Sequence, residues 1–186
     1  MLRPDLCLEF VNTRYWRGRP APTETLNTVE DLTAWAAANV KLRKEMLGQA
    51  EFERAIELRE TIYRLFDATA RDKPPAPRDL EAFNSALAAA PARRRLRKDR
   101  DGFSWTVEMK SSTAHDLLAP VLWSAGDLLA GTRLGRARLC ANPQCRWLFL
   151  DDSRAGKRRW CSMQACGNRA KARRHYRKSR PQDRQD

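Results

Sequence analysis

The stretch Trp160–Arg180 reads WCSMQACGNRAKARRHYRKSR and joins a pair of cysteines to a run of basic residues. Cys161 and Cys166 are separated by four residues, and seven lysines and arginines follow them within this stretch. Upstream, Cys140 and Cys145 have the same four-residue separation, and fifteen residues lie between the two pairs. Two cysteine pairs with equal spacing are typical of a structural zinc site.

We expect the four cysteine sulfurs to bind one Zn²⁺ ion in a closed tetrahedron, which leaves no open position for catalysis. Asn142-Pro143 supplies a turn inside the first pair. A segment with so few apolar residues needs a bound metal to fold. Four unrelated cysteines, two disulfides and an iron–sulfur cluster are the alternatives. Residues 146–150 (RWLFL) and 157–161 (KRRWC) fit the arms of a β-hairpin with a small aromatic core: Trp147, Phe149 and Trp160.

The positive charge of the chain is concentrated in the same region. The 186 residues include 36 Lys and Arg and 23 Asp and Glu, which gives a formal net charge of +13. Residues 131–186 hold 16 of the basic residues and four of the acidic ones, whereas residues 1–130 hold 20 and 19. This balance predicts a polyanionic partner for the C-terminal region, nucleic acid above all. A solvated, partly disordered tail is the alternative.

The basic run itself predicts a helix that binds phosphates. Residues 168–180 contain no Gly or Pro and are rich in good helix formers. A helix that is positive nearly all round repels itself, and it is stabilised when it lies against phosphates and releases their counterions. We therefore predict that nucleic acid contacts the following residues: Arg158, Arg159, Arg169, Lys171, Arg173, Arg174, Arg177, Lys178 and Arg180.

Upstream of this region the pattern is mainly helical. Apolar residues recur at three- and four-residue steps over residues 26–40, 49–69 and 79–90, which predicts three amphipathic helices. Thr28 and Asp31 have the spacing of a capping box at the start of the first helix. The third helix is expected to direct three side chains into the core: Leu80, Phe83 and Leu87.

Three further segments complete the predicted fold. Asp101-Gly102 is a hairpin turn signal, and residues 103–110 alternate between apolar and polar as a strand does. Residues 112–131 form the most apolar helix, placed at the centre of the core, with Pro120 at a kink or in a first turn. For residues 6–11, strand and helix both fit. The predicted fold class is mainly α with a small β-hairpin: a helical N-terminal domain over residues 1–131 and a zinc finger of β-hairpin and basic helix over residues 132–186.

Several classes of protein are not indicated by the sequence. No apolar run suits a signal peptide or reaches 18 residues, so we expect a cytoplasmic protein with no membrane partner. The chain has no phosphate-binding glycine loop and no nucleophile-elbow motif, and it has two histidines. We therefore predict that it is not an enzyme. Cys7, which has apolar neighbours, is expected to be a buried free thiol.

The C-terminal region resembles the CGNR zinc finger. The resemblance is carried by CANPQC, by residues 149–180 (FLDDSRAGKRRWCSMQACGNRAKARRHYRKSR) and above all by Cys166-Gly167-Asn168-Arg169. The upstream part resembles the ABATE domain through LCLEFVNTRYWRGR and LNTVEDLTAWA. The resemblance implies a stress-induced bacterial transcription regulator with these zinc ligands: Cys140, Cys145, Cys161 and Cys166.

Further expectations follow from the resemblance. The finger would bind double-stranded DNA in the bacterial nucleoid, with Gly167 allowing a close turn and Asn168 capping the basic helix. A homodimer suits a protein that reads two half-sites. A protein that binds RNA or the ribosome is the alternative function. The upstream domain would sense a small-molecule effector, for which the polar and aromatic candidates are Asn12, Thr13, Trp16 and Arg17.

Overall fold

The computed structural model describes residues 5–40, 47–93, 95–100, 102–106 and 113–179. These residues form a mainly helical fold with three two-stranded antiparallel sheets. The predicted fold class is therefore confirmed, and the C-terminal region contains both strands and the four clustered cysteines.

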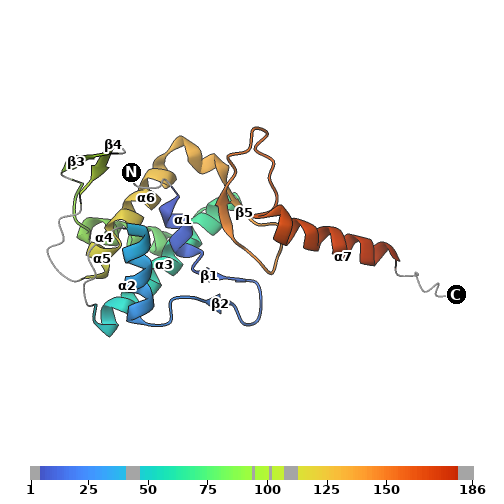
Figure 1. Ribbon diagram of the computed structural model, residues 1–186, viewed down its shortest axis with the longest axis horizontal. Coiled ribbons are helices and arrows are strands. Elements are labelled where there is room, and N and C mark those ends of the chain that lie inside the picture. The colour runs from blue at the N-terminus through green and yellow to red at the C-terminus, as the bar shows by residue number, and fades with distance from the viewer. Residues whose placement is uncertain (1–4, 41–46, 94, 101, 107–112, 180–186) are drawn as a thin grey trace.

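The helices have these bounds: α1 Leu6–Val11, α2 Val29–Val40, α3 Gln49–Ala70, α4 Pro77–Ala89, α5 Ala114–Leu117, α6 Ala119–Ala130 and α7 Asn168–Ser179. A 3₁₀ turn, η1, covers Thr132–Arg136, and a π turn, η2, covers Met163–Gly167. The strands pair as β1 (Arg14–Tyr15) with β2 (Thr23–Glu24), β3 (Leu96–Asp99) with β4 (Gly102–Trp105), and β5 (Ala137–Leu139) with β6 (Leu148–Leu150). Figure 1 shows that α1 to α6 form one body, with β3 and β4 at one end, whereas α7 extends from the other end.

The N-terminal helix α1 lies in the middle of the fold. Both strand and helix fit the sequence of this segment, and the structure has a helix of six residues. A helix this short is stable only when its neighbours cover it. It packs against α3, α6 and β6, and the buried side chains are Leu6, Cys7, Leu8, Phe10 and Val11.

The predicted capping box at the start of α2 is present. The amide of Asp31 donates a hydrogen bond to Thr28 Oγ1 at 3.2 Å, and the amide of Thr28 donates to Asp31 Oδ2 at 3.1 Å. Each side chain thus satisfies an amide that has no partner within the first turn of a helix. The helix accordingly begins at Val29, directly after the capping residue.

The predicted central helix is divided into α5 and α6. Pro120 lies in the first turn of α6, where a helix requires no backbone donor, so the proline is accommodated without a lost hydrogen bond. The side chains of Leu118, Val121 and Leu122 are fully buried. Because α6 packs against α1, α4 and α5, it lies at the centre of the core as predicted.

The prediction for α4 is wrong at one position. Leu80 is 44% exposed, whereas Phe83 is buried and Leu87 packs against the core while partly exposed. The buried side chain in the first turn is instead Asp79, whose carboxylate lies 2.8 Å from the guanidinium of Arg64 on α3. Asp79 is stable there because its charge is paired and lies near the positive end of the helix dipole.

Strands β3 and β4 form the predicted hairpin. Gly102, the first residue of β4, has a φ of 124°, a conformation that side-chain-bearing residues rarely adopt. The register pairs Lys98 with Phe103 on facing strands. β4 covers the first part of the predicted alternation, and its remainder, residues 107–110, lies outside the described residues.

The prediction that residues 146–150 pair with residues 157–161 is wrong. β6 pairs instead with β5, and the loop between these two strands carries the first cysteine pair. The physical reason is burial, because Leu148 and Leu150 of β6 and Ala137 of β5 belong to the main hydrophobic core, in contact with α1 and α3. The C-terminal region is therefore packed onto the helical body.

Candidate metal centre and basic helix

The first cysteine pair lies in the loop that joins β5 to β6. The amide of Cys140 donates to the carbonyl of Trp147 at 2.9 Å and closes the base of the loop. Inside it, the carbonyl of Asn142 accepts from the amide of Cys145 at 2.9 Å, and its Oδ1 accepts from the amide of Gln144 at 3.2 Å. Asparagine favours such turns because its side chain bonds the backbone two residues on. The predicted turn is therefore present between the two cysteines.

The second pair lies where the chain enters the basic helix. Ser162 caps this segment, since its Oγ accepts from the amide of Ala165 at 3.3 Å. The segment is the π turn η2, which contains Cys166 and is followed directly by α7. π-helical turns are rare in proteins, and those that occur often lie at functional sites. The same turn thus supplies a cysteine to the cluster and starts the helix that carries the charge.

The two residues after Cys166 differ in how well they match their predicted roles. The capping role of Asn168 is wrong, because its φ of −65° and ψ of −39° are helical and the cap is Ser162. Gly167 has the predicted close approach, since a Cβ there would lie 2.9 Å from the side chain of Met163. The helical geometry begins before Asn168 because η2 already turns the chain.

The four cysteine sulfurs lie within 4.8 Å of one another. The sulfur atoms of Cys145 and Cys161 are 3.7 Å apart, and those of Cys161 and Cys166 are 3.8 Å apart. A disulfide bond has a length of about 2.05 Å, and all five cysteines are free. Zinc–sulfur bonds of about 2.3 Å at the tetrahedral angle place the sulfurs about 3.8 Å apart. The cluster has the dimensions of a tetrathiolate metal site.

The electrostatics of the cluster also favour a cation. Hydrogen bonds from the thiols of Cys145 and Cys161 lower the pKa of Cys140, and the same interactions raise the pKa values of Cys145 and Cys161. These sulfurs therefore do not ionise together without a metal, because like charges this close repel. A divalent cation removes the conflict and allows every sulfur to bind as a thiolate.

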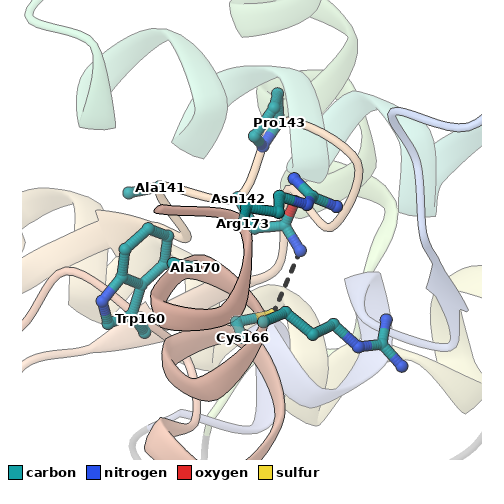
Figure 2. A pocket seen from close by; sticks show the side chains of 8 residues that line it. Ala141, Asn142, Pro143, Trp160, Cys166, Ala170 and Arg173 are labelled. Atoms are coloured by element: carbon teal, nitrogen blue, oxygen red, sulfur yellow. Dashed lines mark hydrogen bonds between the residues drawn. The ribbon is translucent and has the colours of Figure 1, made fainter. Parts of the chain in front are cut away.

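Asn142 also supports the cluster from outside. Its Nδ2 lies 3.5 Å from the sulfur of Cys166, and Figure 2 shows this contact across the gap between the two cysteine segments. An amide that donates to a coordinating sulfur stabilises the thiolate and fixes its direction. The sequence indicates Asn142 as a turn residue, and only the fold brings its side chain to the second cysteine pair.

The loop between the cysteine pairs is organised by Asp151, a residue that no motif in the sequence singles out. One carboxylate oxygen accepts from the amide of Arg158 at 2.7 Å, and the other accepts from the amide of Ser153 at 3.1 Å. The sequence does contain a local indication of one of these bonds, because an aspartate side chain in a turn commonly accepts a hydrogen bond from the backbone amide two residues further on. The loop then returns to the first pair, where the amide of Ala141 donates to the carbonyl of Arg159 at 2.9 Å.

Aromatic side chains surround the cysteines. Trp147, Phe149 and Trp160 pack against them, as predicted. Trp16 joins this group from the N-terminal region, and its φ of 55° is unfavourable for a bulky residue. Such a conformation persists only where surrounding contacts maintain it, and here the contacts are those with the cysteine cluster.

The segment around Trp16 attaches the finger, defined here as residues 132–179, to the helical body. Asn12 is buried and bonds the backbone of Leu148 twice, donating to its carbonyl at 2.8 Å and accepting from its amide at 3.2 Å. The amide of Gly18 donates to the carbonyl of Gln144 at 3.1 Å. The finger is therefore held through both β6 and the first cysteine loop.

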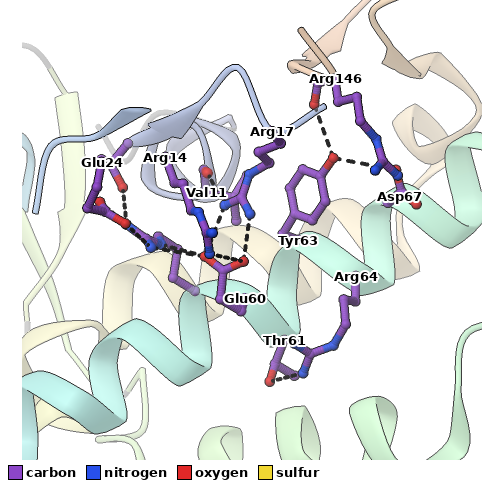
Figure 3. A network of polar contacts seen from close by, with 12 residues as sticks. Val11, Arg14, Arg17, Glu24, Glu60, Thr61, Tyr63, Arg64, Asp67 and Arg146 are labelled. Carbon is purple, nitrogen blue, oxygen red and sulfur yellow. Dashed lines mark hydrogen bonds and ion pairs between the residues drawn. The ribbon is translucent and has the colours of Figure 1, made fainter. Parts of the chain in front are cut away.

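The four residues predicted to bind an effector make contacts inside the protein. Asn12 and Trp16 hold the finger as described, and Thr13 Oγ1 donates to a backbone carbonyl of α1 at 2.7 Å. Arg17 forms a bidentate ion pair with Glu60, with distances of 2.6 and 3.1 Å (Figure 3). These contacts account for the residue types at the four positions. That they bind an effector stays a prediction.

A fully buried arginine, Arg59, lies beside this attachment. Two of its nitrogens each lie 2.6 Å from the carboxylate of Glu24, and a third contact of 3.0 Å joins it to Glu60. Burial alone would raise the pKa values of both carboxyls, but hydrogen bonds and charge from Arg59 and Arg17 outweigh it, so both pKa values are lowered. The charges in this network are therefore paired.

Replacing Gly18 by alanine is expected to loosen the finger from the body. A Cβ at this position would lie 1.8 Å from the carbonyl oxygen of Pro143, a backbone atom that cannot rotate away. Overpacking of this kind lowers the free energy of unfolding by about 1–3 kcal/mol. Urea denaturation measures the loss, and Gly135→Ala is the control because a Cβ there meets nothing within 4 Å. Equal stabilities of the two variants would contradict the close contact.

Four of the basic residues predicted to contact nucleic acid also contact the protein near the cysteines. Arg169 lies over the ring of Trp16 at 4.6 Å, and Arg173 donates to Gln144 at 3.1 Å. Both line a cavity of about 150 Å³ beside Cys166 (Figure 2). The other two contact the segment before the second cysteine pair: Arg158 donates to the carbonyls of Trp160 and Cys161, and Arg159 lies over the ring of Trp160.

The remaining predicted contacts lie further along the basic helix. The side chains of Lys171 and Arg174 are exposed and make no hydrogen bond or ion pair with another described residue. Arg177 and Lys178 belong to α7, and Arg180 lies outside the described residues. Figure 1 shows α7 extending away from the body, so most of its length faces solvent.

The geometry defines a helical domain joined to a finger with a four-cysteine metal site and a basic helix. Residues 4–132 match the ABATE family, described as "Putative stress-induced transcription regulator", and residues 136–179 match the CGNR zinc finger. The chain belongs to the ABATE family and carries a CGNR zinc finger, which confirms the resemblance. No curated protein matches the chain in the comparison. In the described part of the chain, no helix combines the length and the apolar character that a membrane span requires.

Proposed function

We propose that this protein is a bacterial transcription regulator that binds double-stranded DNA of the nucleoid through α7. The observation that carries the proposal is the continuity of η2 with α7, which links the four-cysteine cluster directly to the basic helix. The family description and the net charge of the C-terminal region support the same function. The proposed activity is binding in the cytoplasm, without catalysis.

We propose zinc as the metal. Four thiolates in a tetrahedron are the donor set of structural zinc sites, and all four positions are filled by the protein. When bound, zinc supplies a rigid link between the two cysteine segments. Cys140, Cys145 and Cys161 would hold it together with Cys166, the ligand from the turn that starts α7. The metal thus has a structural role, and the chemistry of recognition belongs to the basic side chains.

The basic helix recognises the backbone of DNA. The side chains of Lys171 and Arg174 are exposed and form no hydrogen bond or ion pair with another described residue, so they are available to phosphates. Arg169 and Arg173 keep the root of α7 in place through Trp16 and Gln144. Contacts with phosphates position a protein on DNA without selecting a sequence. The helix is therefore expected to supply affinity, and its salt dependence is the readout.

Removing the two exposed charges tests this role. If about six phosphates are neutralised, the slope of log K against log salt for a duplex is near −5. Lys171→Ser together with Arg174→Ser is expected to reduce the size of that slope by about 2, equally for all sequences. The control is Lys73→Ser with Arg78→Ser, two exposed residues of the body. A wild-type protein that fails to bind a duplex, or binds independently of salt, would overturn the function.

A cavity beside the cysteines supports a response to a small molecule. It has a volume of about 300 Å³. It is lined by Tyr15 and Trp16 from the body and, from the finger, by Trp147, Ser162, Ala165 and three of the four clustered cysteines: Cys145, Cys161 and Cys166. A small apolar molecule bound there would contact both parts of the chain. We propose this cavity as the effector site.

We also propose that the regulator binds DNA as a homodimer. Sedimentation of the protein with duplex DNA tests this oligomeric state.

A further inference from the structure

The β3–β4 hairpin carries a positive charge that the rest of the N-terminal region lacks. Residues 95–100 (RLRKDR) contain four basic residues and one acidic residue. The rest of residues 1–130 contain 16 basic and 18 acidic residues. A cationic surface on an otherwise anionic region indicates a polyanionic partner at that surface. The exposed basic residues of the hairpin are Arg95, Arg97, Lys98 and Arg100.

Apolar side chains are exposed on the same hairpin. Phe103 is 62% exposed, Leu96 53% and Trp105 38%. Leu96 pairs with Trp105, and Lys98 pairs with Phe103, so the four side chains lie on one face of the two-stranded sheet. Aromatic rings beside cations form the kind of surface on which unpaired bases stack while their phosphates are neutralised.

Protection of a sheet edge and self-association would each account for only part of this surface. Basic residues on an edge strand prevent association between strands, but that role does not require exposed aromatic rings. A second copy of the hairpin could cover the rings, but it would bring two clusters of like charge together. We propose that the β3–β4 hairpin binds single-stranded DNA, with Phe103 and Trp105 stacking on bases and the neighbouring basic residues contacting phosphates.

This surface is separate from the basic helix. Figure 1 shows the hairpin and α7 at opposite ends of the molecule. The proposal goes beyond the duplex binding proposed for α7 and does not depend on it, because the hairpin can bind a strand whether or not α7 binds a duplex. The two surfaces together would suit DNA in which an unpaired segment adjoins a duplex.

Fluorescence anisotropy of the full chain, purified with zinc, tests the proposal. The probes are an oligothymidine of about 20 nucleotides, which exceeds the usual site size, and a duplex of equal length. F103S is expected to bind the single strand about tenfold more weakly, because a stacking contact is lost. F103Y keeps the ring and is expected to bind as the wild type does. L80S is the control, since Leu80 is also exposed but lies on α4.

The charges of the hairpin provide a second, independent measurement. R97S with K98S is expected to reduce the salt slope for the single strand by about 1.4, at about 0.7 for each phosphate contact. Equal single-strand affinities of F103S and the wild type would overturn the proposal. So would a dimer that F103S abolishes, or tighter binding to oligouridine than to oligothymidine. K171S with R174S tests α7 on the duplex probe, so failure of either surface is seen separately.

Discussion

Replacing Cys166 by serine is expected to abolish metal binding at the four-cysteine cluster and to free α7 from its fixed direction. Cys166 lies in the turn that precedes this helix, and its sulfur lies 3.8 Å from that of Cys161. A structural zinc ion contributes about 10–16 kcal/mol to the folding of small finger peptides. The loss should therefore disorder the cysteine loops and the root of α7, while β5 and β6 stay packed on the core of the body.

Elemental analysis of the purified protein measures this effect. Wild-type protein is expected to contain one zinc ion for each four-cysteine site, and the Cys166→Ser variant to contain none. Salt-dependent duplex binding should be lost with the metal. Cys7→Ala is the matched control, because Cys7 is fully buried in the main core, does not belong to the four-cysteine cluster, and has a pKa that burial raises to about 12. A Cys166→Ser protein that keeps its metal and its affinity for the duplex would contradict the site.

Replacing Arg59 by methionine is expected to give the largest loss of stability in the helical body. The guanidinium is fully buried and makes two contacts of 2.6 Å with Glu24. Removing one partner of a buried ion pair leaves the other charge uncompensated, which costs about 3–5 kcal/mol. Urea denaturation at neutral pH measures the change. Arg54→Met is the control on the same helix, since Arg54 is 61% exposed and an exposed pair contributes about 1 kcal/mol or less.

The same network predicts a dependence of stability on pH. The pKa values of Glu24 and Glu60 are lowered in the folded state from the ordinary 4.5, because their interactions with arginine outweigh burial. Their contribution is therefore fully present above pH 4.5 and is lost as the pH falls through the lowered values. Arg59→Met should weaken this loss at acidic pH. An unchanged acid limb in the variant would contradict the pairing.

Local signals explain the features that the sequence predicts correctly. The apolar periodicity of α3 and the capping box at Thr28 and Asp31 each depend on residues only a few positions apart. The interactions that they predict therefore form within a single helix or at its first turn. The cysteine cluster is also readable, because a metal site uses few side chains of one type at set spacing. In each case the residues that stabilise the feature can be recognised from their types and their spacing along the chain.

Strand pairing and helix faces depend on distant partners. β5 and β6 have three residues each, too few to show an alternation, and their pairing is decided by the burial of Leu148 and Leu150 against α1 and α3. Leu80 is exposed because Asp79, its neighbour, has the buried ion pair with Arg64 of another helix. The periodicity of α4 places both residues near the boundary between its buried and exposed faces. Only the position of Arg64 on the neighbouring helix determines that Asp79 is the buried one.

The attachment of the finger to the body could not be read from the sequence for a different reason. Asn12 bonds the backbone of Leu148, and Gly18 bonds the carbonyl of Gln144. Backbone groups are the same at every position, so the partner residues carry no signature of the contact. The polar residues of this segment are therefore open to interpretation as a ligand site.

The leucines of β6 also constrain how this architecture can change over time. Leu148 and Leu150 fill space beside α1, and the side chain of Asn12 bonds the backbone amide and carbonyl of Leu148. If recombination separated the chain at residue 131, the helical body would lose two core side chains, Leu148 and Leu150. The same two leucines would be exposed to solvent on a finger that was joined to a different body. The finger therefore cannot be exchanged freely between proteins. A mutation on one side of this junction must be compatible with the side chains on the other side, so we expect the two parts of the chain to be inherited together.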